Sequence, residues 1–100
     1  MTAGDFTAAV AASLYAATPD GDARRFLDYL IDHPGIRIWS EAMQQDLGFA
    51  EHKQIALAAW TVGKEAAKLG IARPWNEAQL GYTMSEETAS LLAAARSADR

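Results

Sequence analysis

Ser40, Asp46 and His52 are the residues whose types could form a hydrolytic triad of nucleophile, acid and base. Ser40 does not lie in the glycine-flanked turn of a nucleophile elbow, and a role as the N-cap of a helix explains it without catalysis. His33 and His52 lie 19 residues apart without a second pair of ligands, and the chain has no cysteine, so a zinc site is not expected. We therefore expect neither an enzyme nor a bound metal or other cofactor.

Contact with DNA is the second chemistry that the sequence could support. Residues 51–69 are expected to form a long helix, and the side chains at its start would meet base edges if it entered a major groove. Lysine can donate to guanine, and glutamine can pair with adenine. The expected base readers are His52, Lys53 and Gln54, the expected phosphate contacts are Arg37, Lys64, Lys68 and Arg73, and the residues expected to reach a neighbouring groove are Asn76 and Gln79.

The charge balance argues against strong DNA binding. The chain has 9 basic and 13 acidic residues, for a net charge of −4. A free-standing DNA-binding domain is more often basic, because phosphate contacts supply most of its affinity. Residues 36–75 are close to neutral, which reduces this objection, since most of the acidic residues lie in the flanks. The alternative explanation is that the lysines form an ordinary solvated surface.

Two large apolar side chains, Leu57 and Trp60, fall on the same face of the long helix as the lysines and opposite its expected core stripe. An exposed tryptophan beside a leucine often marks an interface. Three explanations stay open: a terminal helix packs over both residues, they form a self-association or partner interface, or they contact DNA directly. The expected interface residues, which include the apolar stripe of the first helix, are Phe6, Val10, Leu14, Leu57 and Trp60.

Hydrophobic periodicity and capping residues predict the elements that position these side chains. The expected helices run from an N-cap at Asp5 to about residue 17, from residue 20 or 22 to 33, from a cap at Ser40 to residue 47, over 51–69, and from a cap at Ser85 to a tail that frays over 97–100. The expected strands cover 36–39, 71–75 and 80–84, and residues 76–79 join the last two. Pro74 would confine its strand to an edge or an end of a sheet. Trp39 and Trp75 are expected to pack in the core or against the hairpin formed by the last two strands.

The residues at these turns resemble a known fold. The segments Trp39-Ser40 through Leu47-Gly48, Leu69-Gly70-Ile71 and Gly81-Tyr82 are similar to those of a bacterial winged helix-turn-helix domain. The pattern Phe26-Leu27-x-Tyr29-Leu30, His33-Pro34-Gly35, Trp39-Ser40, Leu47-Gly48 and Gly81-Tyr82-x-Met84 resembles an uncharacterised family of small actinobacterial proteins of this type, over residues 22–95. The resemblance implies a mostly α fold with a short β-hairpin wing at 71–84, in which the helix over 51–69 takes the recognition position.

Length and composition predict one unit in three parts: an alanine-rich helix over 1–18, a winged-helix core over 19–84, and a C-terminal helix and tail over 85–100. The expected function is that of a DNA-associated, transcription-regulator-like protein that acts as a homodimer on double-stranded DNA. The alternative is a winged-helix module for protein interaction or dimerisation without nucleic acid. A cytoplasmic location is expected and a membrane partner is not, because the alanine-rich start lacks the basic residues of a signal peptide and no apolar run approaches about 18 residues.

Overall fold

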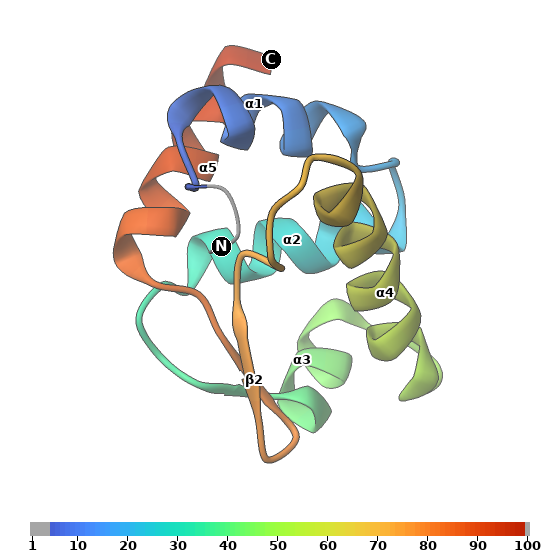
Figure 1. The fold of residues 1–100 in the computed structure, drawn as a ribbon. Coiled ribbons are helices and arrows are strands. Elements are labelled where there is room, and N and C mark those ends of the chain that lie inside the picture. Colours follow the sequence, from blue (N-terminus) through green and yellow to red (C-terminus); the bar gives the residue numbers. More distant parts are fainter. Residues whose placement is uncertain (1–4, 100) are drawn as a thin grey trace.

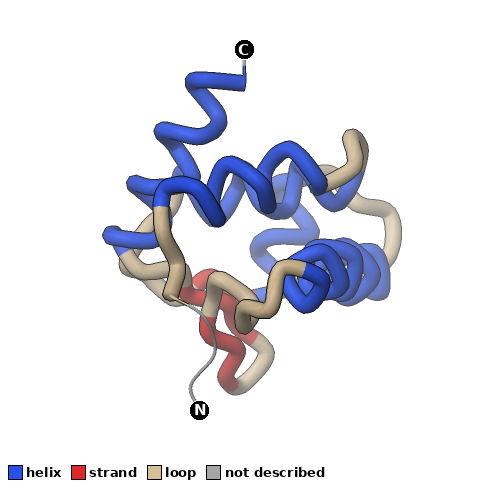
Figure 2. Tube along the Cα trace, turned by 45° about the horizontal axis from the view of Figure 1, so that its top comes forward, coloured by secondary structure: helices blue, strands red, loops and turns tan. Residues whose placement is uncertain are grey.

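The computed structural model describes residues 5–99, which form five helices and three short strands. In chain order the elements are α1 (Ala8–Ala17), α2 (Asp22–Asp32), β1 (Ile38–Trp39), α3 (Ser40–Leu47), α4 (Lys53–Lys68), β2 (Asn76–Ala78), β3 (Gly81–Thr83) and α5 (Glu86–Asp99). Figure 1 shows α2 at the centre of the molecule, between α1 and α5 on one side and α3 and α4 on another. The strands gather at one end, away from the C-terminus (Figure 2). The prediction of a mostly α chain with a short β-hairpin is confirmed.

The three strands form one antiparallel sheet in the order β1-β3-β2. Ile38 lies opposite Tyr82, and Ala78 lies opposite Gly81. This register leaves Gln79 and Leu80 as a two-residue turn, with φ angles of 48° and 64°. Two positive φ angles are typical of the type I′ turn, whose twist matches that of the flanking strands.

The predicted strand over residues 71–75 is wrong, and residues 76–78 of the predicted connection form β2 instead. Pro74 has no N–H to donate to a neighbouring strand. Ile71, Pro74 and Trp75 are buried, so this segment packs as a loop against the core. Its apolar residues therefore indicate burial rather than strand pairing.

The N-terminal caps of two helices also differ from the predictions. Thr7, and not Asp5, caps α1, because its Oγ1 accepts a hydrogen bond from the N–H of Val10 at 3.2 Å. Ser40 is already the first residue of α3 rather than its cap, and no side-chain hydrogen bond caps that helix. The sequence locates both helices correctly but assigns the wrong side chain to each cap.

The terminal helices α1 and α5 share one hydrophobic core with the rest of the chain. The buried cluster includes Ala11 and Leu14 of α1, Leu27 of α2 and Leu92 of α5. Leu14 is fully buried, so it is not available as the interface residue that the sequence predicts. The predicted fraying is also wrong for residues 97–99, which continue α5 as far as Asp99. Residue 100 lies outside the described residues.

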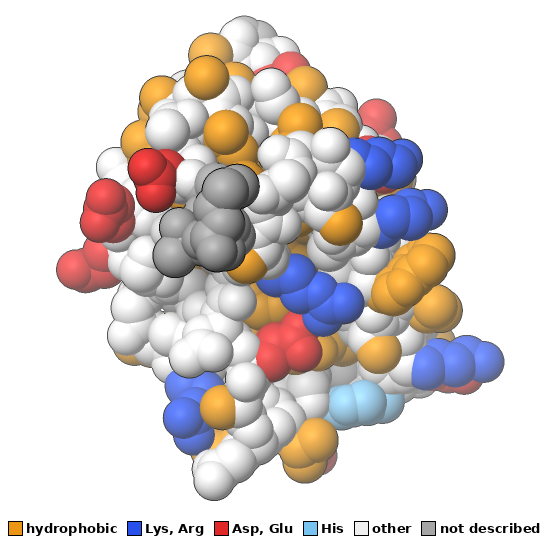
Figure 3. All heavy atoms as spheres, in the orientation of Figure 1, with side chains coloured by type: hydrophobic (Ala, Val, Ile, Leu, Met, Phe, Trp, Pro, Cys, Tyr) orange, Lys and Arg blue, Asp and Glu red, His pale blue; other side chains and the backbone are white. Residues whose placement is uncertain are grey.

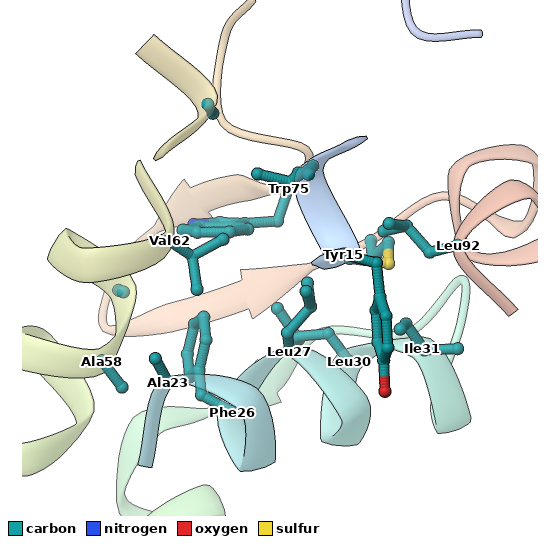
Figure 4. Packing of buried hydrophobic residues seen from close by; sticks show 14 of the residues in the cluster. Tyr15, Ala23, Phe26, Leu27, Leu30, Ile31, Ala58, Val62, Trp75 and Leu92 are labelled. Atoms are coloured by element: carbon teal, nitrogen blue, oxygen red, sulfur yellow. The ribbon is translucent and has the colours of Figure 1, made fainter. Parts of the chain in front are cut away.

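Phe26 lies where α2, α4 and the sheet meet (Figure 4). Its ring packs edge to face on two other aromatic rings, with centroid distances of 5.2 Å to Trp75 and 5.3 Å to Tyr82. Val62 of α4 faces the same group, and Phe26 and Val62 are both fully buried. Edge-to-face aromatic pairs add about 0.5–1.5 kcal/mol each beyond the effect of burial. Phe26 therefore holds the sheet and the loop before β2 against the helices.

Phe26→Ala should lower the free energy of unfolding by about 3–5 kcal/mol, because it leaves a cavity among three elements and removes both aromatic contacts. Urea unfolding followed by circular dichroism measures this loss. The control is Ile36→Ala, whose side chain is 57% exposed and whose truncation should change stability by no more than about 0.5 kcal/mol. Similar losses for the two variants would contradict the central role of Phe26.

Tyr29 connects α2 to α3, because its hydroxyl donates a hydrogen bond to the carboxylate of Asp46. Burial raises the pKa of Tyr29 from 10.0 to about 12, and the hydrogen bond and the negative charge of Asp46 act in the same direction. In the unfolded chain the phenol ionises near its ordinary value, so the folded state keeps its proton to higher pH. The contribution of Tyr29 to stability is therefore complete below pH 10 and is lost as the pH rises from 10 toward 12.

We expect the difference in free energy of unfolding between the wild-type chain and Tyr29→Phe to shrink over that pH interval. Parallel urea titrations at a series of pH values measure the difference. Tyr15 and Tyr82, whose pKa values burial also raises, are present in both chains, so their contributions cancel. A difference that stays constant through the interval would show that Asp46 and burial do not hold the proton on Tyr29.

Candidate interaction surface

α4 buries one face and exposes the other. Ile55, Ala59, Val62 and Ala66 are buried as the sequence predicts, whereas Leu69, expected to continue this stripe, follows the last residue of the helix and is 38% exposed. We use the name outer face for the exposed α4 residues on the opposite side, which are Lys53, Leu57, Trp60, Lys64 and Lys68.

Leu57 and Trp60 are large apolar side chains that remain 58% and 55% exposed on the outer face. The Nζ atom of Lys64 lies 4.7 Å from the centroid of the Trp60 ring, a cation–π arrangement that places the lysine stem along the indole. In Figure 3 apolar side chains over α4, on the right of the view, lie between basic ones. Within residues 5–99 no terminal helix packs over this pair, so of the three explanations that the sequence leaves open, intramolecular packing is not observed.

The side chains predicted to read bases make hydrogen bonds within the chain. The Oε1 atom of Gln54 accepts a hydrogen bond from the N–H of Glu51 at 2.8 Å, and its Nε2 donates to Asp22 at 3.2 Å. The Nε2 atom of His52 lies 3.2 Å from Oγ of Ser40. These contacts satisfy a backbone donor at the start of α4 and connect that end of the helix to α2 and α3. Gln54 and His52 therefore have structural roles that a base contact would have to replace.

Three of the cations predicted to contact DNA each lie against a glutamate. The pairs are Lys53–Glu51 at 3.2 Å, Lys68–Glu65 at 3.2 Å and Arg73–Glu77 at 2.7 Å. Such exposed pairs contribute only about 0–1 kcal/mol to stability, but each places a carboxylate where a phosphate would have to bind. Arg37 and Lys64 have no carboxylate partner among the described residues and lie over the rings of Trp39 and Trp60 instead.

The remaining predicted site residues do not gather into one surface. Asn76 is exposed at the start of β2, and Gln79 is exposed in the hairpin turn. Phe6 and Val10 are half-buried and pack against the core. The apolar stripe at the N-terminal end of the chain thus serves the core, and Leu57 and Trp60 are the two predicted interface residues that are mainly exposed.

A cleft of about 340 Å³ lies between the start of α3 and the tip of the β-hairpin. Its lining residues are Trp39, Ser40, Glu41, Gln44, His52 and Leu80, and we call it the hairpin cleft. A hydrogen bond of 2.8 Å from the N–H of Ser40 to the carbonyl oxygen of Leu80 joins its two sides. The cleft is not predictable from the sequence, because the proximity of Trp39 and Leu80 depends on the pairing of β1 with β3.

The hairpin cleft brings together two residues of the triad considered from the sequence, since Ser40 and His52 are hydrogen-bonded. Asp46 does not complete it, because its carboxylate accepts the hydrogen bond from Tyr29. Among residues 5–99, no three side chains of the metal-binding types are grouped so that they could hold an ion. None of the helices in this part of the chain has the length and apolar character needed to cross a membrane.

Gln54→Ala should lower the free energy of unfolding by about 1 kcal/mol, because it removes the acceptor for the Glu51 N–H and the hydrogen bond to Asp22. Chemical unfolding measures the loss. Gln45→Ala is the matched control, since Gln45 is an exposed glutamine inside α3 and alanine is favourable at such a position. Equal stability of the two variants would mean that Gln54 does not organise the start of α4.

No family model, no curated protein and no solved structure matches this chain.

Proposed function

We propose that this chain is a winged-helix module that forms a homodimer through the outer face of α4. The winged-helix assignment is supported by the element order α2-β1-α3-α4-β2-β3 and by the sheet order β1-β3-β2. α3 and α4 follow each other through a tight turn that begins at Gly48, whose φ is +69°. With this assignment α4 takes the recognition position and the hairpin is the wing.

The exposure of Leu57 and Trp60 near the middle of α4 is the observation that carries the proposal. Both side chains are more than half exposed, although burying either would be favourable by about 1.5–3 kcal/mol. The side chains that would make α4 a reader of DNA are meanwhile engaged within the chain. The outer face is thus better suited to an apolar protein contact than to a nucleic-acid groove.

A second copy of the chain suits this face because Trp60 lies near the midpoint of α4, which runs from Lys53 to Lys68. If two α4 helices pack antiparallel about a two-fold axis near Trp60, the two indoles meet at the centre. Leu57 of each copy then lies over the stem of the other copy's Lys64. Each copy thus supplies and receives the same contacts, as in the isologous interfaces of most homodimers. The shared helix length is about 24 Å, at 1.5 Å per residue.

The charges on the outer face permit this self-contact. An isologous interface brings identical surfaces together, so an uncompensated row of lysines would repel its own copy. Lys53 and Lys68, near the two ends of α4, each carry a glutamate 3.2 Å away. The ends of the interface are therefore close to neutral, and Lys64 contributes its aliphatic stem while its ammonium group stays near the indole.

DNA binding is a second candidate. It is favoured by Lys64 and Arg37, whose positive charges are not paired with a carboxylate among the described residues. Two phosphate contacts would give only a weak dependence on salt, with a slope of about −2 in the logarithmic plot. The dimer and the DNA complex through α4 exclude each other, because an outer face covered by a second copy cannot enter a major groove. One pair of measurements therefore decides between them.

Trp60→Ala should raise the dissociation constant of the homodimer by at least about 30-fold, because truncation of a buried tryptophan at the centre of an interface costs about 2 kcal/mol or more. Analytical ultracentrifugation over a concentration series measures this constant. Trp39→Ala is the matched control, since Trp39 is 52% exposed but lies outside α4. Lys53→Glu combined with Lys64→Glu should leave DNA retention at its low wild-type level.

Two results would overturn the dimer proposal. The first is a wild-type chain that stays monomeric at millimolar concentration, or a dimer that Trp60→Ala does not weaken. The second is fluorescence anisotropy showing that labelled duplex DNA binds at low salt, that binding weakens with added salt with a slope of about −2 in the logarithmic plot, and that the double lysine variant abolishes it. That second result would establish the DNA-binding candidate instead.

A further inference from the structure

We propose that the hairpin cleft binds a basic side chain, arginine or lysine, of a polypeptide partner. The cleft lies outside the outer face of α4, so this site goes beyond the proposed dimer and does not depend on it. Three features of the cleft support such a site. They are a strained apolar residue at the hairpin tip, an exposed tryptophan beside it, and a set of hydrogen-bond acceptors with one carboxylate between α3 and α4.

Leu80 is strained and exposed at the same time. Its φ of 64° places it in the left-handed region, where a side chain with a Cβ costs free energy. Asparagine and glycine are the usual residues of such turns. The Leu80 side chain is 79% exposed, so packing within residues 5–99 repays little of that cost. Leu80 therefore makes the fold less stable than glycine would, which indicates a contact outside the chain.

Trp39 forms the other apolar side of the cleft. It lies opposite Gly81 in the β1–β3 register, next to the turn that carries Leu80. Of the two placements predicted for Trp39, the core is wrong, because the residue is 52% exposed. Its position opposite Gly81 places it beside the hairpin instead. An indole and an isobutyl group at either side of a cleft suit the aliphatic stem of a long side chain, and the face of an indole attracts a cationic head group.

The polar lining of the cleft is rich in acceptors. Gln44 uses its Nε2 to donate to the carbonyl oxygen of Phe49 at 3.3 Å, so its Oε1 remains to accept a hydrogen bond. Glu41 lies in the first turn of α3 and is exposed. None of the salt bridges among the described residues includes it. A guanidinium or ammonium group has donors only, and carboxylate and amide oxygens are the partners it requires.

Arg37 would repel a cation that binds in the cleft, because its guanidinium carbon lies 5.9 Å from the centroid of the Trp39 ring. The contact shows that the indole already accommodates one guanidinium group. The net charge of −4 favours a basic over an acidic partner at long range. Removing the charge of Arg37 should therefore strengthen the binding of a basic side chain.

The direct test is an NMR titration of the full chain with three probes. They are a capped pentapeptide with a central arginine between alanine and glycine residues, the same peptide with citrulline in place of arginine, and free agmatine. We expect the arginine peptide to shift the indole resonance of Trp39 and the side-chain amide of Gln44, and to bind at least as tightly as agmatine. The citrulline peptide has the same shape without the charge and should bind at least ten-fold more weakly. A ten-fold loss of affinity corresponds to about the free energy of one charged hydrogen bond.

Variants assign the contacts. Glu41→Gln should weaken binding about ten-fold and Trp39→Ala about five-fold, whereas Arg37→Gln should strengthen it. Leu80→Gly should weaken binding while raising the melting temperature by about 4 °C, because glycine relieves the strain of the turn. Ser90→Ala, at an exposed position of α5, is the control and should leave binding unchanged.

The opposite results overturn the proposal. With the wild-type chain, these are equal affinity for the arginine and citrulline peptides, binding of agmatine without binding of the arginine peptide, or no change in any resonance of the cleft with any probe. With Arg37→Gln, the opposite result is a lower affinity for the arginine peptide than that of the wild-type chain. A Leu80→Gly variant that loses stability would remove the argument from strain. The melting temperature identifies that case independently of the titration.

Discussion

The packing of Phe26 is the contact on which the rest of the structure depends. The strands are two or three residues long, which is too short for a sheet to be stable in water without packing against another element. Phe26 provides that packing, because its ring meets Tyr82 of β3 and Trp75 of the preceding loop edge to face. The same ring lies beside α4 (Figure 4). Together with the pairing of β1 and β3, this contact from the centre of α2 fixes the position of the hairpin, and the geometry of the hairpin cleft depends on it.

Charge pairing within the chain is the second constraint. Arg96 of α5 lies 3.4 Å from Asp28 and 2.8 Å from Asp32, so two carboxylates of α2 are matched by a cation from the other end of the chain. Arg24 lies 3.7 Å from Asp99 and adds a second link between the same helices. In a chain with more acidic than basic residues, cations used in this way are not available for phosphate. On α4 itself, Lys53 and Lys68 are paired with the nearby Glu51 and Glu65, so few cations on this side of the chain remain unpaired.

The sequence predicts the helices better than the hairpin, and the reason is physical. α2 carries a complete apolar stripe and ends before Pro34-Gly35, so local signals alone place it within a residue or two. The outer face of α4 follows from helical periodicity in the same way. The hairpin has no comparable local signal, because its turn uses Gln79 and Leu80 where asparagine or glycine would be expected. The hairpin cleft could not be predicted at all, since Trp39 and Leu80 are 41 positions apart in the chain and meet only through the β1–β3 register.

The two candidate surfaces have one physical feature in common, which is apolar area that the fold does not need. Leu57, Trp60, Trp39 and Leu80 are each more than half exposed, and the core is complete without them. The hairpin cleft and the outer face are also joined through the start of α4, where His52 lines the cleft and Lys53 begins the outer face. The hydrogen bonds of His52 and Gln54 hold that end of the helix to α3 and α2, so the end of α4 that both surfaces share is joined to the rest of the fold. A partner in the cleft and a second copy on α4 would therefore be held in a fixed relation to each other, which is what a small domain needs in order to join two binding partners.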